Sequence, residues 1–249
     1  MKLVTTILLI GLFLPASVCR GISVDNLTLM SEQFPPFNFE ESGRLQGTSI
    51  DLMELILEKV SSKLTRKDIT LLPWARGYNA LLTENNTVLF VVTRTSEREH
   101  LFKWVGPIST ARNVLIARKD RHISLKSVAE ARKYKIGVVR QDAGEQLVVK
   151  AGIALETLDR TSEALANIRK LDKGRIDLFA YDEAVTHWLM QKNGINPNDF
   201  ETVAVTKKGY HFFAFHKNTP DELIRKFQQA LEQLKKEGAC DKIMALYLK

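Results

Sequence analysis

The chain has 249 residues, a formal net charge of +7 and 45% hydrophobic residues, enough for one large domain or for two lobes with their own hydrophobic cores. Its basic residues are mixed with acidic ones at helical spacing, and no basic segment is interleaved with aromatic residues, so nucleic-acid binding is not expected. After removal of a leader only Cys240 remains, and the five histidines lack metal-ligand spacing, which argues against a disulfide framework and a metal site.

Residues 1–20 have the composition of a secretory signal peptide. Lys2 precedes an apolar run from Leu3 to Leu14, and small residues follow near Cys19. This run is shorter than the roughly 20 residues that a transmembrane helix requires. We therefore expect cleavage and secretion. The sequence ASVC only weakly resembles a lipoprotein cleavage box, which argues against a lipid anchor at Cys19.

Short apolar strands alternate with amphipathic helices over the remaining chain. In the first half of the chain we expect strand 27–30, helix 48–60, strand 69–72, helix 75–82, and strands 87–92 and 113–118. In the second half we expect helix 125–132, strand 135–140, helix 143–152, strand 155–158, helix 162–174, strand 175–181 and helix 182–194. Strands 201–205 and 210–215 follow, and two final helices are separated at Gly238.

Repeated strand–helix–strand units predict a mostly parallel α/β fold. The number of elements suits two small open sheets better than one large sheet. Because ligands bind beyond the carboxyl ends of strands in such sheets, we expect a binding site in the cleft between two lobes. No HExxH, GxSxG, P-loop or GxGxxG motif occurs, so neither catalysis nor a cofactor is expected.

Six segments follow one another along the chain: FPPFNFEESGRLQGTSIDLMELI, TRTSERE, FKWVGPI, KIGVVRQDAGE, LDKGRIDLFAYDEA and GACDKI. In this order they resemble the periplasmic solute-binding proteins of the polar amino-acid type, solute-binding family 3. The resemblance covers nearly all of the mature chain. It implies a two-lobed, type II periplasmic-binding-protein fold, in which residues 22–108 and 210–249 form the first lobe, residues 109–209 form the second, and two hinge strands join them.

The resemblance also implies a function. A periplasmic, monomeric protein would capture an amino acid or a related carboxylate by closing the two lobes, and would deliver it to an inner-membrane ABC permease. A sensing role, in which the occupied protein contacts a membrane receptor, is an alternative. An enzyme on the same fold, similar to the cyclohexadienyl dehydratases, is another.

Arg98 and Asp182 are the two expected charged anchors. In the family, the arginine of the TRTSERE segment binds the ligand carboxylate, and a guanidinium suits a carboxylate because it offers two parallel hydrogen bonds. A surface ion pair with Glu97 or Glu99 is the alternative. The family's aspartate at the end of RIDLFAYD binds the α-ammonium, although Asp182 is equally suited to cap the next helix. A zwitterion could bridge the two lobes through both residues.

Four further residues complete the expected site. By resemblance, Phe34 stacks on the ligand and Thr93 contacts it at a strand end, although Thr93 could equally be a plain strand residue. Trp74 forms either a wall of the cleft or part of the core. Asp142 occupies a turn that contacts the carboxylate in relatives, and it would repel that group unless it caps its own helix. Family members that bind ligands with basic side chains carry an acidic residue at the position of Ser31. Lysine or arginine is therefore not expected as the ligand.

Overall fold

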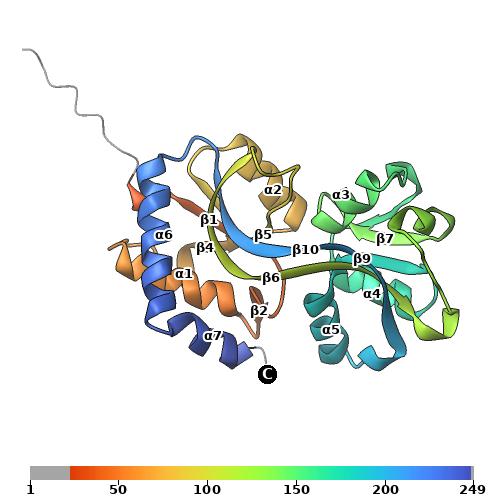
Figure 1. Cartoon of the computed structure of the whole chain (residues 1–249). Coiled ribbons are helices and arrows are strands. Elements are labelled where there is room, and N and C mark those ends of the chain that lie inside the picture. Colours follow the sequence, from red (N-terminus) through yellow and green to blue (C-terminus); the bar gives the residue numbers. More distant parts are fainter. Residues whose placement is uncertain (1–22, 248–249) are drawn as a thin grey trace, which may run out of the picture.

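The computed structural model describes residues 23–247, which form two α/β lobes joined by two long strands (Figure 1). The strands are β1 (Thr28–Ser31), β2 (Phe39–Glu41), β3 (Arg44–Gln46), β4 (Ile69–Leu71), β5 (Thr87–Thr93), β6 (Phe102–Arg118), β7 (Ile136–Val139), β8 (Asp159–Thr161), β9 (Leu178–Asp182) and β10 (Phe200–His216). The α-helices are α1 (Thr48–Lys59), α2 (Trp74–Thr83), α3 (Ala143–Lys150), α4 (Ala164–Asp172), α5 (Glu183–Lys192), α6 (Asp221–Lys236) and α7 (Ala239–Tyr247).

The first lobe contains β1, β4 and β5 with α1, α2, α6 and α7, and the second contains β7, β8 and β9 with α3, α4 and α5 (Figure 1). The strand order is β4-β1-β5-β10-β6-β9-β7-β8. Strands β4, β1 and β5 pair in parallel in the first lobe, and β8, β7 and β9 pair in parallel in the second. The expected two-lobed α/β fold is therefore confirmed.

The two connecting strands are longer than the sequence pattern predicted. Expected strands 201–205 and 210–215 are one strand, β10, and β6 extends well before residue 113. They pair antiparallel from Phe200↔Arg118 to His216↔Phe102, with three irregularities in register. Because both strands continue through both lobes, hydrogen bonding unites the two expected sheets into one eight-stranded sheet.

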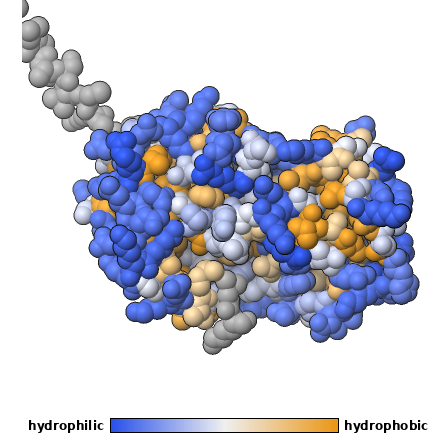
Figure 2. Space-filling view, in the orientation of Figure 1, coloured by the Kyte–Doolittle hydropathy of each residue, from blue (hydrophilic) through white to orange (hydrophobic). Residues whose placement is uncertain are grey.

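The helices and central strands form where apolar residues recur at the right period. Every residue of β5 and β9 is buried, as expected for parallel strands covered on both faces. Helix α6 buries Leu223, Phe227, Leu231 and Leu234, which recur at three- and four-residue spacing on one face. Its outer face is hydrophilic (Figure 2), so its mixed charges belong to a solvated helix surface.

Two local predictions were wrong, and one hairpin was not predicted. The strand expected over 155–158 lies at β8, because Asp159 and Thr161 pair with β7 while Leu155–Thr157 forms a 3₁₀ turn. The helix expected over 125–132 is a short 3₁₀ segment, Val128–Lys133, that buries only Ala131, and such turns are common as connectors. The loop after β1 contains the β2–β3 hairpin, which is too short and polar to show an alternating pattern.

Three of the expected polar site residues lie at the carboxyl ends of strands: Arg98 follows β5, Asp142 follows β7, and Asp182 ends β9. Glu32, which was not expected at the site, follows β1 in the same way. These four strands belong to both lobes, so the loops can meet where the lobes contact each other. Within residues 23–247, no helix combines the length and apolar character that crossing a membrane requires.

Candidate functional site

All six expected site residues are buried in the described part of the chain. They are Phe34, Trp74, Thr93, Arg98, Asp142 and Asp182. Arg98 is only 1% exposed, so it is not a surface arginine paired with Glu97 or Glu99. Lys150 pairs with Glu97 and Arg94 pairs with Glu99. Arg98 is therefore free of both neighbouring acids.

The Arg98 guanidinium contacts both lobes. Its Nε donates to Gln146 Oε1 at 3.0 Å, one Nη donates to the Gln141 carbonyl at 3.2 Å, and the other donates to the Thr93 carbonyl at 3.3 Å. Thr93 thus helps to orient Arg98 through its backbone. A guanidinium has five N–H groups, so two remain after these three hydrogen bonds, the number that a bidentate carboxylate accepts.

Two aromatic rings of α2 support the guanidinium. The Arg98 Cζ atom lies 5.3 Å from the Trp74 ring centroid and 5.0 Å from that of Tyr78. The two rings stack on each other with centroids 5.5 Å apart. Cation–π contacts of this kind keep a buried cation in place while leaving its donors available. Trp74 therefore belongs to the surroundings of Arg98 and also lines the cavity described below.

Asp142 caps its own helix, α3. This is the arrangement in which a ligand carboxylate could bind nearby without being repelled by Asp142. Its Oδ2 accepts from the Gly144 backbone N–H at 3.1 Å, at the N-terminus of α3. Burial raises the pKa of this carboxyl, and the Arg98 charge opposes that rise. Asp142 therefore lies within electrostatic reach of Arg98 without forming an ion pair with it.

Asp182 both caps α5 and faces the hinge. Its Oδ1 accepts from Val185 N–H at 3.2 Å, and its Oδ2 accepts from Arg112 N–H at 3.3 Å. The Nε2 atom of the fully buried His211 lies 3.8 Å from Oδ2. Burial lowers the pKa of His211 to about 3, so this imidazole is neutral near pH 7. No charged partner therefore compensates Asp182 within the described residues.

The absence of a cation beside Asp182 makes the stability of the protein dependent on pH. Burial raises the pKa of Asp182 from 3.8 to about 7, and the Asp142 charge adds to the rise, while backbone hydrogen bonds from Val185 and Arg112 oppose it. Between these two values the folded protein holds a proton that the unfolded chain has lost. Stability contributed by this proton is complete below pH 3.8 and is lost as the pH rises to about 7.

Asp182→Asn keeps a side chain that can cap the helix. We expect it to remove the pH-dependent part of the free energy of unfolding that Asp182 contributes. The free energy of unfolding of the wild type, without ligand, should fall more steeply between pH 4 and pH 7 than that of the variant. Urea unfolding of both proteins at several pH values measures the difference. Parallel curves would show that Asp182 is not held protonated by its surroundings.

Phe34 lies between the hinge and the second lobe. Its ring centroid is 5.7 Å from those of Tyr181, His211 and Phe37. Tyr181 precedes the anchor Asp182 on β9, so Phe34 of the first lobe packs against the strand end that carries the anchor. Phe34 thus lies beside the end of β9 but does not line the inter-lobe cavity, and Phe37 packs on His211.

Several buried polar atoms around these residues have no hydrogen-bond partner within the described chain. They are Ser31 Oγ, Trp74 Nε1, Asn113 Nδ2, Gln141 Oε1 and His211 Nε2. Buried polar groups are nearly always satisfied in folded proteins. A group of unsatisfied donors and acceptors in one region therefore indicates a place where a polar ligand binds.

The two lobes contact each other on both sides of this region. On one side, Lys150 of α3 donates to Ser96 Oγ at 3.1 Å. On the other, Lys192 of α5 lies 3.2 Å from Glu41, and the Phe39 and Trp188 rings are 5.1 Å apart. These contacts join the two lobes around the interior groups.

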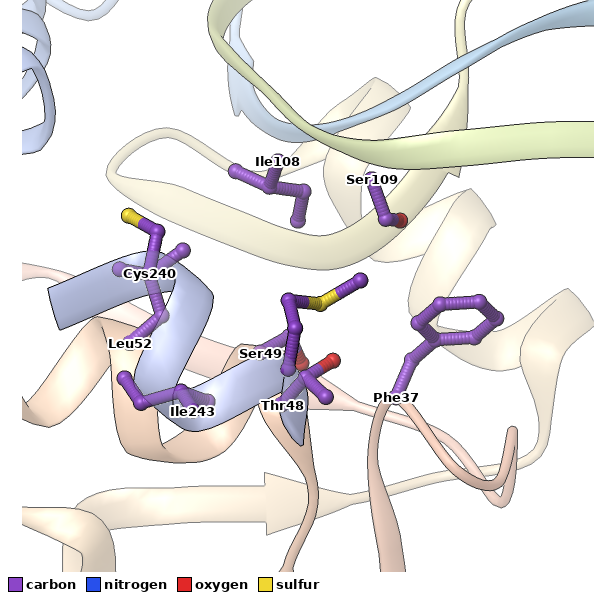
Figure 3. A pocket seen from close by; sticks show the side chains of 9 residues that line it. Phe37, Thr48, Ser49, Leu52, Ile108, Ser109, Cys240 and Ile243 are labelled. Carbon is purple, nitrogen blue, oxygen red and sulfur yellow. The ribbon is translucent and has the colours of Figure 1, made fainter. Parts of the chain in front are cut away.

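A cavity of about 540 Å³ lies between the lobes next to Trp74 and Tyr181. A second hollow lies among α1, α7 and β6, where Phe37, Ser49 and Cys240 surround it (Figure 3). Its volume of about 10 Å³ is on the order of a single water molecule. The inter-lobe cavity is much larger and has room for a small solute.

The sequence analysis missed three residues of this region. Glu32 follows β1 and lines the cavity, a position that the rule about carboxyl ends of strands would have flagged. Tyr181 also lines it from the end of β9. His211 reaches the site through its pairing with Ser109, whose Oγ lies 2.9 Å from Nδ1, and no sequence signal indicates that pairing. Within residues 23–247, no cluster of His, Cys, Asp or Glu side chains could hold a metal ion.

Comparisons with known proteins identify the family and support the two-lobed fold. The sequence profile of "Bacterial extracellular solute-binding proteins, family 3" matches residues 27–249. The probable amino-acid-binding protein YxeM of Bacillus subtilis is 26% identical over 85% of this chain and 79% of its own length. A probable histidine-binding protein of Neisseria gonorrhoeae is 26% identical over 86% of this chain and 80% of its own length.

A solved structure supports the same assignment. An ancestral arginine-binding protein bound to arginine superposes with a TM-score of 0.76 and 26% identity, over 91% of this chain and all of that protein. The profile match spans both lobes and both connecting strands, and all six segments that suggested the resemblance lie inside it. The chain therefore belongs to the bacterial extracellular solute-binding proteins of family 3.

Proposed function

We propose that this protein is a non-enzymatic, periplasmic binding protein for an α-amino acid. Arg98 of the first lobe holds the ligand carboxylate, and Asp182 of the second lobe holds the ammonium. Phe34 and Trp74 form aromatic walls, while Thr93 and Asp142 orient the charged groups. The observation that carries this proposal is a fully buried arginine with two N–H groups to spare, opposite a buried acid that lacks a cation.

The likeness to amino-acid-binding and histidine-binding proteins, and to a structure that holds arginine, supports an amino acid as the ligand. A zwitterion satisfies both anchors, because a carboxylate uses the free donors of Arg98 and an ammonium keeps Asp182 ionised. The ligand would contact both lobes only when they are closed, and its binding would therefore favour the closed state.

The lobes are proposed to be residues 22–108 with 210–249, and residues 109–209, so that the hinge lies where β6 and β10 pass between them. The leader, residues 1–20, lies outside the described residues and is proposed to be a cleaved signal peptide. The monomeric protein would present its ligand to an inner-membrane ABC permease.

A thermal-shift screen tests the proposal. Ligand that binds only the folded protein stabilises it by about 2.7 kcal/mol at about 100 times Kd, which corresponds to a Tm rise of about 5–10 °C. We expect at least one α-amino acid to produce such a rise, and its α-amide or its decarboxylated analogue to produce none. A screen in which no amino acid stabilises the protein, or in which the analogues do so equally, would contradict the proposal.

A further inference from the structure

The start of α3 provides the contacts of the second lobe to Arg98. The Gln141 carbonyl accepts from one Nη of Arg98 at 3.2 Å, and Gln146 Oε1 accepts from its Nε at 3.0 Å. Gln146 Nε2 also donates to the Gln141 carbonyl at 3.3 Å. These acceptors orient the guanidinium, so their positions determine where its two remaining N–H groups point.

Gln141 has an uncommon backbone conformation in the turn that joins β7 to α3. Its φ angle is 62°, in the left-handed region, which a residue with a Cβ atom seldom adopts. Such a conformation persists where the surrounding structure holds it. The position of the Gln141 carbonyl, which accepts from Arg98, therefore depends on the contacts that hold this turn.

Glu145, in the first turn of α3, provides such a contact. It is 5% exposed, and its Oε1 accepts from the Gln141 backbone N–H at 2.9 Å. Gln141 lies outside both β7 and α3, so its N–H depends on this carboxylate for an acceptor. The hydrogen bond fastens the turn to the helix that follows it.

Arg160 of β8 holds Glu145 in its turn. Its Nε donates to Glu145 Oε2 at 2.6 Å, and one Nη donates to Oε1 at 3.0 Å, the two parallel hydrogen bonds of an arginine–carboxylate pair. Strand β8 lies at the edge of the sheet and pairs with β7, where Arg160 stands opposite Val138. A chain of polar contacts thus runs from this edge strand through Glu145 and Gln141 to Arg98.

We propose that Glu145 is a positioning residue for the carboxylate site and that Arg160 fixes it in place. The inference rests on the proposed function, because it concerns the orientation of Arg98. Glu145 and Arg160 act through the Gln141 carbonyl, which can accept from Arg98 only when the lobes are closed. The pair thereby stabilises the closed state and raises the affinity for an amino acid.

Titration calorimetry tests the inference, and the probe is the common α-amino acid that raises the wild-type Tm most. Glu145→Ala removes the acceptor of the Gln141 N–H and is expected to weaken binding by about ten- to a hundredfold, as for a lost hydrogen bond to a charged group. Arg160→Met should weaken it by about three- to tenfold, because Glu145 remains but is no longer oriented. Glu145→Gln keeps an acceptor oxygen and should bind at least about threefold more tightly than Glu145→Ala.

The variant Arg98→Lys distinguishes positioning from general damage to the second lobe. Lysine cannot reproduce the guanidinium fork that meets Gln141 and Gln146 together. In this background Glu145→Ala should therefore weaken binding by less than about threefold. Losses of equal size in the wild-type and Arg98→Lys backgrounds would mean that Glu145 acts independently of Arg98, and would overturn the inference.

Lys170→Met is the matched control. Lys170 of α4 donates to Asp159 of the same strand β8 at 2.5 Å, and its side chain is 32% exposed, against 33% for Arg160. Its replacement should change affinity by less than about threefold. Unchanged affinity in Glu145→Ala and Arg160→Met, or an equal loss in Lys170→Met, would overturn the inference while amino-acid binding remained. If the wild type binds no amino acid, the proposed function fails and the inference fails with it.

Discussion

Replacing Arg98 with alanine is expected to weaken amino-acid binding by about a hundredfold to a few thousandfold. The ligand carboxylate would enter a buried site without its cation, and an unpaired buried charge costs about 3–5 kcal/mol. The truncation also leaves Gln146 Oε1 and the Gln141 carbonyl without their donor from the first lobe. Calorimetry with the ligand identified by thermal shift measures the loss.

Arg98→Lys separates the charge of the side chain from its shape. Lysine keeps the positive charge but cannot offer two parallel N–H groups to a carboxylate. We therefore expect an affinity between those of the wild type and the alanine variant. Circular dichroism and Tm of both variants show whether each is folded, so that a binding defect is not confused with unfolding.

Arg94→Ala is the control for these variants. Arg94 stands four residues earlier in the same segment, but its side chain is partly exposed and pairs with Glu99. Exposed ion pairs contribute little to stability, and the Arg94 side chain contacts Glu99, Trp104 and Phe212, none of which is a proposed ligand-binding residue. Its replacement should change affinity by less than about threefold. Equal losses in the Arg94 and Arg98 variants would refute the assignment of Arg98 as the carboxylate-binding residue.

The family resemblance singled out Arg98 and Asp182 as anchors, and the sequence could place both at strand ends because each follows a strongly apolar strand. Arg98 comes after TVLFVVT and Asp182 ends LFAYD, and both strands are buried throughout. Local rules also offered a helix-capping role as an alternative for Asp182 and as a condition for Asp142, and both residues cap the helices that follow them. Strand ends and helix caps depend on residues that are adjacent in the sequence, so they can be predicted without the structure.

Other features depend on contacts between distant segments. His211 approaches Asp182 only because β10 pairs with β6 in one register. Glu32 is buried between residues of both lobes; its place after a strand can be read from the sequence, but its burial cannot. Strand β8 is polar, and it forms because β7 offers it a parallel partner. Contacts between distant segments therefore determine each of these features, because the local sequence preference for them is weak.

Gly144→Ala is expected to cause the largest loss of stability among the changes considered. A Cβ atom at Gly144 would lie 2.2 Å from the Ala180 carbonyl oxygen and 2.8 Å from its carbon, and both belong to the backbone of β9. Helix α3 would have to move away from this strand. Overpacking of this kind costs about 3 kcal/mol, so Tm should fall by about 6–12 °C.

The same displacement should also weaken binding, because it separates two parts of the proposed site. The N-terminus of α3 carries Gln141 and Asp142, whereas β9 ends at Asp182. Gly209→Ala is the control, since its Cβ would meet only the Lys207 Cε atom at 3.6 Å, an ordinary contact, and alanine restricts the unfolded chain. Calorimetric scanning and titration of both variants measure the two effects. A Gly144 variant as stable as the Gly209 variant would show that α3 and β9 are not in close contact, and the proposed placement of Asp142 near Asp182 would then fail.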